Sequence, residues 1–168
     1  MKTILLFVLL TLISVFPQEK YKTFTDEKSG KIMLVGEITR EAFRDTSFAW
    51  WYNSEYENYS PDKVVLDSIA IKSADVKIVI VLGTWCSDSR REVPRFFKIT
   101  DSLKIMADRI KLISVDRDKK DLSGKVDSLN IELVPTFIFC RNENEMGRIT
   151  EAPIETLEKD FNAIVWKE

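Results

Sequence analysis

Residues 76–94 read VKIVIVLGTWCSDSRREVP. The segment from Val76 to Leu82 is a near-continuous apolar run, which is typical of a β-strand buried on both faces of a sheet. A glycine ends this run, and apolar residues then recur at helical spacing across 92–106. We therefore predict a buried strand, a sharp turn and a helix, with Cys86 where the turn meets the N-terminus of the helix.

Cys86 has the surroundings expected of a reactive thiol. Unpaired backbone N–H groups and the positive end of the helix macrodipole both stabilise a thiolate at a helix N-terminus. Arg90 and Arg91 in the first turn add positive charge, and Asp88 opposes them. Because disulfide exchange requires a partly exposed thiolate, we interpret Cys86 as a nucleophile rather than as an inert buried cysteine.

Strands and helices alternate along the chain on either side of this segment. Apolar runs predict further strands at 31–38, 109–115, 136–140 and 145–150. Helical patterns predict a turn at 39–45 and helices at 48–59, from Ser60-Pro61 onward, at 121–129 and at 154–165. This order indicates an α/β fold with a partly parallel, mixed central sheet, to which a terminal hairpin adds an antiparallel edge.

From about Pro61 to Glu168 the chain resembles the thioredoxin superfamily. Trp85-Cys86-Ser87-Asp88-Ser89 stands where that family has Trp-Cys-x-x-Cys, and Pro94 matches the proline that bends the active-site helix. Val134-Pro135-Thr136 is similar to the cis-proline loop that precedes a strand, and Gly147 lies where the family often has a glycine in its last strand. The resemblance implies a thioredoxin-like fold, with the mixed sheet flanked by helices.

The resemblance also implies a site made of five residues. Cys86 and Ser89 would be the catalytic pair, and Trp85, Val134 and Pro135 would bind the substrate. A cis bond before Pro135 would turn the Val134 backbone outward, and in the family that backbone pairs with the extended substrate chain. An ordinary trans proline at the start of a strand is the alternative reading.

Two positions depart from the family pattern. Ser89 replaces the second, resolving cysteine, so a mixed disulfide on Cys86 would be released only by an outside thiol or by the second cysteine of the client. Ser89 would still donate a hydrogen bond to the Cys86 thiolate. Ile80 occupies the position of the buried acid that serves the second cysteine, so the two losses are chemically consistent.

The other cysteine, Cys140, is not expected to resolve the mixed disulfide. It follows Pro135 on the same predicted strand, about 16 Å further along at extended rise, which is far beyond the reach of a disulfide. We predict a small buried apolar role for Cys140 and no bridge to Cys86. The chain has no histidine, so a Cys-His pair is excluded, and neither a metal site nor a cofactor is expected.

The chain divides into three parts by composition. Residues 1–17, with Lys2 before an apolar run, are predicted to be an export signal or an uncleaved N-terminal anchor. Residues 18–60 form an N-terminal extension, which begins with a flexible lead-in or edge strand and contains the aromatic-rich helix. That helix is interpreted as packing on the core, with a binding platform as the alternative. Residues 61–168 form the thioredoxin-like domain.

The balance of basic and acidic residues narrows the classes of partner that we expect. The chain carries 25 basic and 27 acidic residues without long runs of either sign, so neither nucleic acid nor an anionic membrane surface is expected to bind, and a membrane contact would come only through the N-terminal segment. The main hypothesis is an exported protein of the bacterial periplasm or envelope. It would exchange protein disulfides through Cys86 and be released by an external thiol or a thioredoxin-type reductant. The alternative is a redox-inactive binding module that holds client proteins.

Overall fold

The computed structural model describes residues 20–167. The predicted export signal or anchor at 1–17 lies outside the described residues. Within the described part, no helix is both long enough and apolar enough to cross a membrane.

One six-stranded mixed sheet organises the fold, with the strand order β1-β2-β4-β3-β5-β6. The two central strands, β3 and β4, are parallel, and every other pairing in this sheet is antiparallel. The predicted mixed sheet with a terminal antiparallel hairpin is therefore confirmed. The strands are β1 (Tyr21–Thr25), β2 (Ile32–Ile38), β3 (Lys77–Leu82), β4 (Ile110–Ser114), β5 (Thr136–Arg141) and β6 (Asn144–Thr150).

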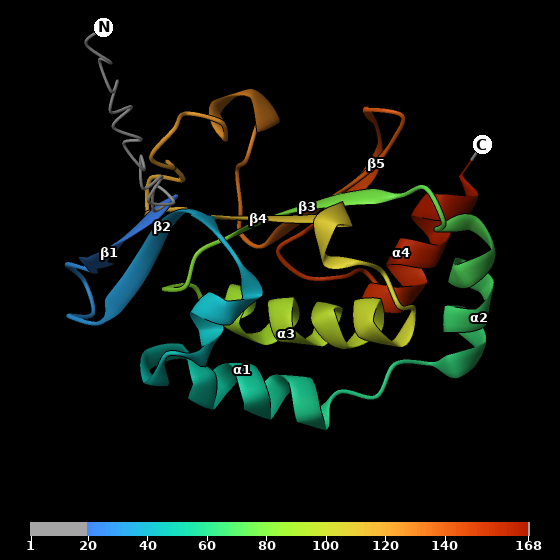
Figure 1. The fold of residues 1–168 in the computed structure, drawn as a ribbon, viewed down its shortest axis with the longest axis horizontal. Coiled ribbons are helices and arrows are strands. Elements are labelled where there is room, and N and C mark those ends of the chain that lie inside the picture. The colour runs from blue at the N-terminus through green and yellow to red at the C-terminus, as the bar shows by residue number, and fades with distance from the viewer. Residues whose placement is uncertain (1–19, 168) are drawn as a thin grey trace, which may run out of the picture.

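The α-helices all contribute to the core on one face of this sheet. Figure 1 shows α3 lying between the sheet and α1, so α1 covers the outer side of α3. The opposite face is covered by the segment 116–135, which packs Val126 and Val134 against β3 and β4. The helices are α1 (Thr46–Asn58), α2 (Lys63–Lys72), α3 (Ser87–Ser102) and α4 (Leu157–Trp166), with short 3-10 turns η1 (Arg40–Arg44), η2 (Ala107–Arg109) and η3 (Asp127–Leu129).

The N-terminal extension is part of this architecture. The lead-in contains β1, which pairs with β2, and β2 pairs with β4. In the aromatic-rich helix α1, Phe48, Trp51 and Tyr52 are buried, so the helix packs on the core as interpreted from its spacing. Trp50 is the exception, because 64% of it remains exposed.

Phe96 of α3 lies at the centre of an aromatic cluster. Its ring centroid is 4.7 Å from that of Phe137, 5.8 Å from that of Phe139 and 5.9 Å from that of Phe161. These partners come from β5 and α4, so Phe96 joins α3 to the sheet and to the C-terminal helix. All four side chains are fully buried.

We expect Phe96→Ala to lower the free energy of unfolding by about 3–5 kcal/mol, because it removes a large buried side chain and leaves a cavity. Denaturant unfolding followed by circular dichroism measures this value. The exposed Trp50→Ala serves as the control and should change the free energy by less than about 0.5 kcal/mol. Equal losses in the two variants would contradict the central position of Phe96.

Some predicted helix boundaries differ from the structure. The helix expected from Ser60-Pro61 begins at Lys63, because the Asp62 carboxylate accepts the N–H groups of Val64 and Val65 as an N-cap. The helix with apolar spacing across 92–106 is α3, which begins directly after Cys86, as the motif predicts, but ends at Ser102. It ends early because Lys104 adopts a left-handed backbone conformation and the next N–H bonds back to the Thr100 carbonyl.

The helix predicted at 121–129 was wrong. Only the 3-10 turn Asp127–Leu129 forms there. The Asp121 carboxylate accepts the N–H groups of Ser123 and Val126, which gives the backbone an alternative to helical bonding. Gly124, with a φ of 70°, turns the chain between them.

Candidate functional site

Cys86 is the N-cap of α3, directly after β3 and its turn. Its backbone is extended, its N–H donates to the Gly83 carbonyl at 2.8 Å, and its carbonyl accepts the Arg90 N–H at 3.1 Å. The side chain is half-buried, so it is accessible to a second sulfur. Local hydrogen bonding therefore places the thiol at the strand-to-helix junction that the sequence pattern predicts.

Val134 and Pro135 lie beside this thiol. The peptide bond between them is cis, and the Cys86 Sγ–H donates to the Val134 carbonyl oxygen at 3.2 Å. Both residues are buried and precede β5, which is hydrogen-bonded to β3. Two segments that are 48 residues apart in the chain thus meet at one sulfur atom.

Ser89 is fully buried in the first turn of α3. Its hydroxyl oxygen accepts the Gly83 N–H at 3.1 Å. The sequence analysis expected this hydroxyl to donate to Cys86, whereas the hydrogen bond that forms ties the helix to the preceding turn. Ser89 therefore stabilises the loop that carries Cys86.

Trp85 is fixed from two directions. Its indole N–H donates to the Val115 carbonyl at 2.9 Å, and the Arg117 guanidinium lies 4.8 Å from its ring centroid. Gly83 permits this packing, because a Cβ at that position would lie 2.6 Å from the indole ring. The tryptophan of the motif is thus held in place by the segment that follows β4.

Asp26, in the turn between β1 and β2, holds Arg117 in this position. Its carboxylate is almost completely buried and accepts from Arg117 Nε at 2.6 Å and from Nη2 at 2.8 Å. The Ser29 N–H donates to the same carboxylate. Neither Asp26 nor Arg117 was predicted from the sequence, although Arg117 follows the predicted strand 109–115 by two residues and so lies at the same end of the sheet as the cysteine.

The pairing with Arg117 holds the pKa of Asp26 well below its ordinary value, mainly through the side-chain hydrogen bond. A carboxyl group with a lowered folded-state pKa adds stability above its unfolded pKa of about 4, and this stability is lost as the pH falls through the folded value. Asp26→Asn should therefore reduce stability at pH 7. It should also remove much of the loss of stability that the wild type shows below about pH 4.

Urea midpoints of wild type and Asp26→Asn at neutral and acidic pH measure this dependence. The difference between the two proteins should shrink as the pH is lowered. Asp67→Asn is the matched control, because that side chain is 75% exposed and its ion pair spans 3.9 Å. If the difference is constant with pH, the ionised pair at Asp26 does not exist in the folded protein.

The two arginines after the motif have different roles. Arg91 pairs with Asp88 at 2.8 Å and with Glu92 at 2.5 Å. Arg90 instead turns back, and its Nε donates to the Thr84 carbonyl at 2.6 Å. The ion pairs formed within residues 20–167 do not include Arg90. Burial lowers the pKa of the Arg90 guanidinium.

The family of this chain is shown by its similarity to known proteins. The family model described as Thioredoxin matches residues 62–163. The chain belongs to the thioredoxin family. Thioredoxin H9 of Arabidopsis thaliana is 29% identical over 101 residues, which is 59% of this chain and 68% of the relative. Thioredoxin domain-containing protein 2 of Rattus norvegicus is 31% identical over 93 residues, 54% of this chain and only 16% of that protein.

Solved structures show more distant likenesses. Mitochondrial thioredoxin 3 of Saccharomyces cerevisiae has 18% identity and a TM-score of 0.40, covering 65% of this chain and 98% of its own. A Pseudomonas aeruginosa protein of unknown function has 15% identity and a TM-score of 0.47, with 70% and 78% covered. Membership of the thioredoxin family supports a thiol–disulfide oxidoreductase type of function, with a thiol or disulfide as the substrate.

In this thioredoxin-family chain the remaining sequence-predicted positions, Ile80 and Cys140, lie on the neighbouring strands β3 and β5. Ile80 is fully buried in the core. Cys140 pairs in register with Lys77 at the start of β3, whereas Cys86 follows the end of that strand. Both cysteines are free, as expected. Cys140 is half-buried rather than fully buried, and this burial raises the pKa of its thiol.

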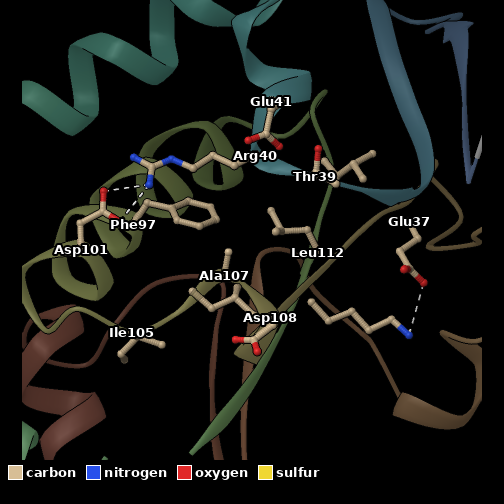
Figure 2. A pocket seen from close by; sticks show the side chains of 13 residues that line it. Glu37, Thr39, Arg40, Glu41, Phe97, Asp101, Ile105, Ala107, Asp108 and Leu112 are labelled. Atoms are coloured by element: carbon tan, nitrogen blue, oxygen red, sulfur yellow. Dashed lines mark hydrogen bonds and ion pairs between the residues drawn. The ribbon is translucent and has the colours of Figure 1, made fainter.

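A cleft of about 630 Å³ lies elsewhere in the thioredoxin-family fold. Figure 2 shows Arg40 bonded to Asp101 across it, above Leu112. Asp101 is near the C-terminus of α3 and thus about 20 Å from Cys86 along the helix at 1.5 Å per residue. The Asp101 end of the cleft therefore lies far from the thiol. No group of acidic, cysteine or histidine side chains within residues 20–167 could hold a metal ion.

Proposed function

We propose that this chain exchanges disulfides in client proteins through Cys86 alone, as an isomerase or reductase. The observation that carries this proposal is the Cys86 thiol at the N-terminus of α3, 3.2 Å from the Val134 carbonyl, with a serine in place of the second thiol. The thiol is accessible, and its nearest partner is the backbone that would receive a client chain.

The reaction has two balanced steps. The Cys86 thiolate attacks one sulfur of a client disulfide, so that bond breaks, a Cys86–client disulfide forms and the other client sulfur leaves as a thiolate. A client cysteine then attacks the mixed disulfide, which rearranges the client and regenerates Cys86 with no net oxidation. If an external dithiol attacks Cys86 Sγ instead, the second client sulfur leaves as a thiolate. The other thiol of the dithiol then displaces Cys86, so the client is reduced and the dithiol is oxidised to a disulfide.

Val134 and Trp85 are proposed to hold the client during this exchange. The client chain would lie extended beside Val134, with backbone hydrogen bonds of the kind found in strand addition. Trp85, fixed by Val115 and Arg117, would form one wall of the groove. Because Pro135 has no N–H, the peptide group that it shares with Val134 would offer the client only the Val134 carbonyl.

The alternative proposal is a binding module without redox turnover. Position 89 holds a serine, which is bonded to Gly83 and supplies no second sulfur. A module that only holds clients would not need one. In either case we propose that the segment at 1–17 directs the protein to the periplasm or envelope of a bacterium. Fractionation of cells that produce the full chain, with mass analysis of its N-terminus, tests this location.

A trapping experiment separates exchange from binding. The purified protein is mixed with a scrambled disulfide client, quenched with acid and analysed by non-reducing mass spectrometry. Exchange predicts an adduct whose mass is protein plus client and whose linkage maps to Cys86, together with recovery of native client. Client bound without an adduct would instead support the binding module.

A further inference from the structure

A second hollow, distinct from the large cleft, lies next to the first turn of α3. It has a volume of about 340 Å³ and is lined by Gly30, Lys31, Ile32, Ser47, Trp50 and Arg90. Five of these residues belong to the N-terminal extension. Trp50 is 64% exposed and Ile32 is 44% exposed, so two large apolar side chains face solvent at one place on the surface.

The lining is apolar and cationic. Lys31 and Arg90 are its charged members, and none of the six lining residues is acidic. Of the carboxylates in the neighbouring turns, Asp26 is engaged with Arg117 and Asp45 with the Ser47 N–H, and Glu27 is not part of the lining. Arg90 uses Nε on the Thr84 carbonyl and has no carboxylate partner in the described chain. The hollow therefore favours a ligand that carries an anionic group next to an apolar group.

The hollow lies across Cys86 from the cis-proline loop. In the sheet, β5 pairs with β3 on one side, while β4 and then β2 follow on the other. Figure 1 shows the turn between β1 and β2 at the end of the sheet where α3 begins. Arg90 lies four residues after Cys86 in α3, so the lining of the hollow begins about one helical turn from the thiol.

We propose that this hollow selects client segments that carry an acidic residue and an aromatic or aliphatic residue near the reacting cysteine. The proposal rests on the proposed exchange function and adds to it a preference among clients. The acidic side chain would pair with Lys31 and Arg90, and the apolar one would pack on Trp50 and Ile32. The occupant is a protein segment, because the same chain must also reach Val134.

The test measures adduct formation with matched peptides. Each short peptide has one cysteine blocked by 2-mercaptoethanol, flanked either by Glu and Phe or by Lys and Phe. Cys86 attacks the peptide sulfur, the bond to 2-mercaptoethanol breaks, and 2-mercaptoethanol leaves as the thiolate. The rate constant for wild type is expected to be about tenfold higher with the acidic peptide, and high salt should reduce this ratio.

Variants assign the preference to the hollow. Lys31→Glu should bring the ratio to about one or below, whereas Lys63→Glu should leave it unchanged, because Lys63 is an exposed α2 residue away from the β1–β2 turn. Trp50→Ala should slow the reaction of these peptides by about threefold, but not the reaction of the same peptides with Ala in place of Phe. Trp166→Ala on α4 is its control.

Two small disulfides complete the design. Neutral bis(2-hydroxyethyl) disulfide reports the reactivity of Cys86 without use of the hollow, and the dicarboxylate 3,3′-dithiodipropionate reports attraction of charge alone. If the neutral disulfide reacts and both peptides react equally, the client preference is overturned while exchange stands. The rate gain of the dicarboxylate over the neutral disulfide is compared with that of the acidic over the basic peptide. If the two gains are equally large, the choice of a protein segment as the occupant is also overturned. No reaction with any disulfide overturns the exchange function itself.

Discussion

Cys86→Ser should form no covalent adduct with any client disulfide and should reduce exchange to the uncatalysed rate. The reason is structural: within residues 20–167 the other thiol is Cys140, which lies at the opposite end of β3. Loss of a nucleophile that nothing else replaces costs far more than 100-fold in other covalent enzymes, so we expect a loss of at least about 100-fold here. The rate of native disulfide recovery in a scrambled client measures it.

Cys140→Ser is the matched control for this experiment. It changes the same atom in the same way, on a half-buried thiol whose pKa is raised by burial. Adduct yield and exchange rate should therefore equal those of the wild type. If Cys140→Ser abolishes adducts, or if Cys86→Ser keeps them, the assignment of the nucleophile is wrong.

Ser89→Cys should shorten the lifetime of client adducts by at least about tenfold. Position 89 lies one helical turn after Cys86, and Ser89 is fully buried against the turn at Gly83. A thiol there can attack the mixed disulfide from within the molecule, where the effective concentration of an attacking group is far above that of a thiol in solution. The client leaves reduced, and Cys86 and the new cysteine are oxidised to a disulfide.

The lifetime is measured by acid quenching at intervals after adduct formation. Ser89→Ala is the control, because it also removes the hydrogen bond to Gly83 but supplies no sulfur, and its adducts should persist as in wild type. The fully buried Ile80 offers no proton acceptor to the new thiol, so Ile80→Asp in the Ser89→Cys background should speed release further. Equal lifetimes in Ser89→Cys and Ser89→Ala would show that position 89 cannot reach the adduct.

The sequence was most informative where the pattern is local. The strand β3, the helix after it and the position of Cys86 follow from one apolar run, one glycine and one helical pattern. The hairpin of β5 and β6 follows in the same way. Hydrophobic periodicity is a strong signal for such elements because each strand or helix face must be buried. The positions of Val134 and Pro135 followed from the family resemblance rather than from any local pattern.

What the sequence did not reveal depends on distant contacts. Asp26 and Arg117 are separated by 91 residues, and neither belongs to a motif, so their pairing at Trp85 follows only from the sheet order. The missing helix at 121–129 has a different cause. Its apolar spacing was adequate, but the Asp121 carboxylate captures nearby N–H groups and Gly124 turns the chain. When a side chain competes with the backbone for hydrogen bonds in this way, the spacing of apolar residues in the sequence stays the same and does not reveal it.

The pairing of β2 with β4 has a consequence for where this protein could be joined to others. The family model begins at residue 62, yet a chain cut there would lose β1, β2 and α1 and would leave β4 as a bare sheet edge. It would also uncover the core surface on which Phe43, Phe48 and Trp51 pack. Bare edges and apolar patches promote association between chains. The unit that evolution or an engineer could transplant intact is therefore larger than the unit that sequence families define.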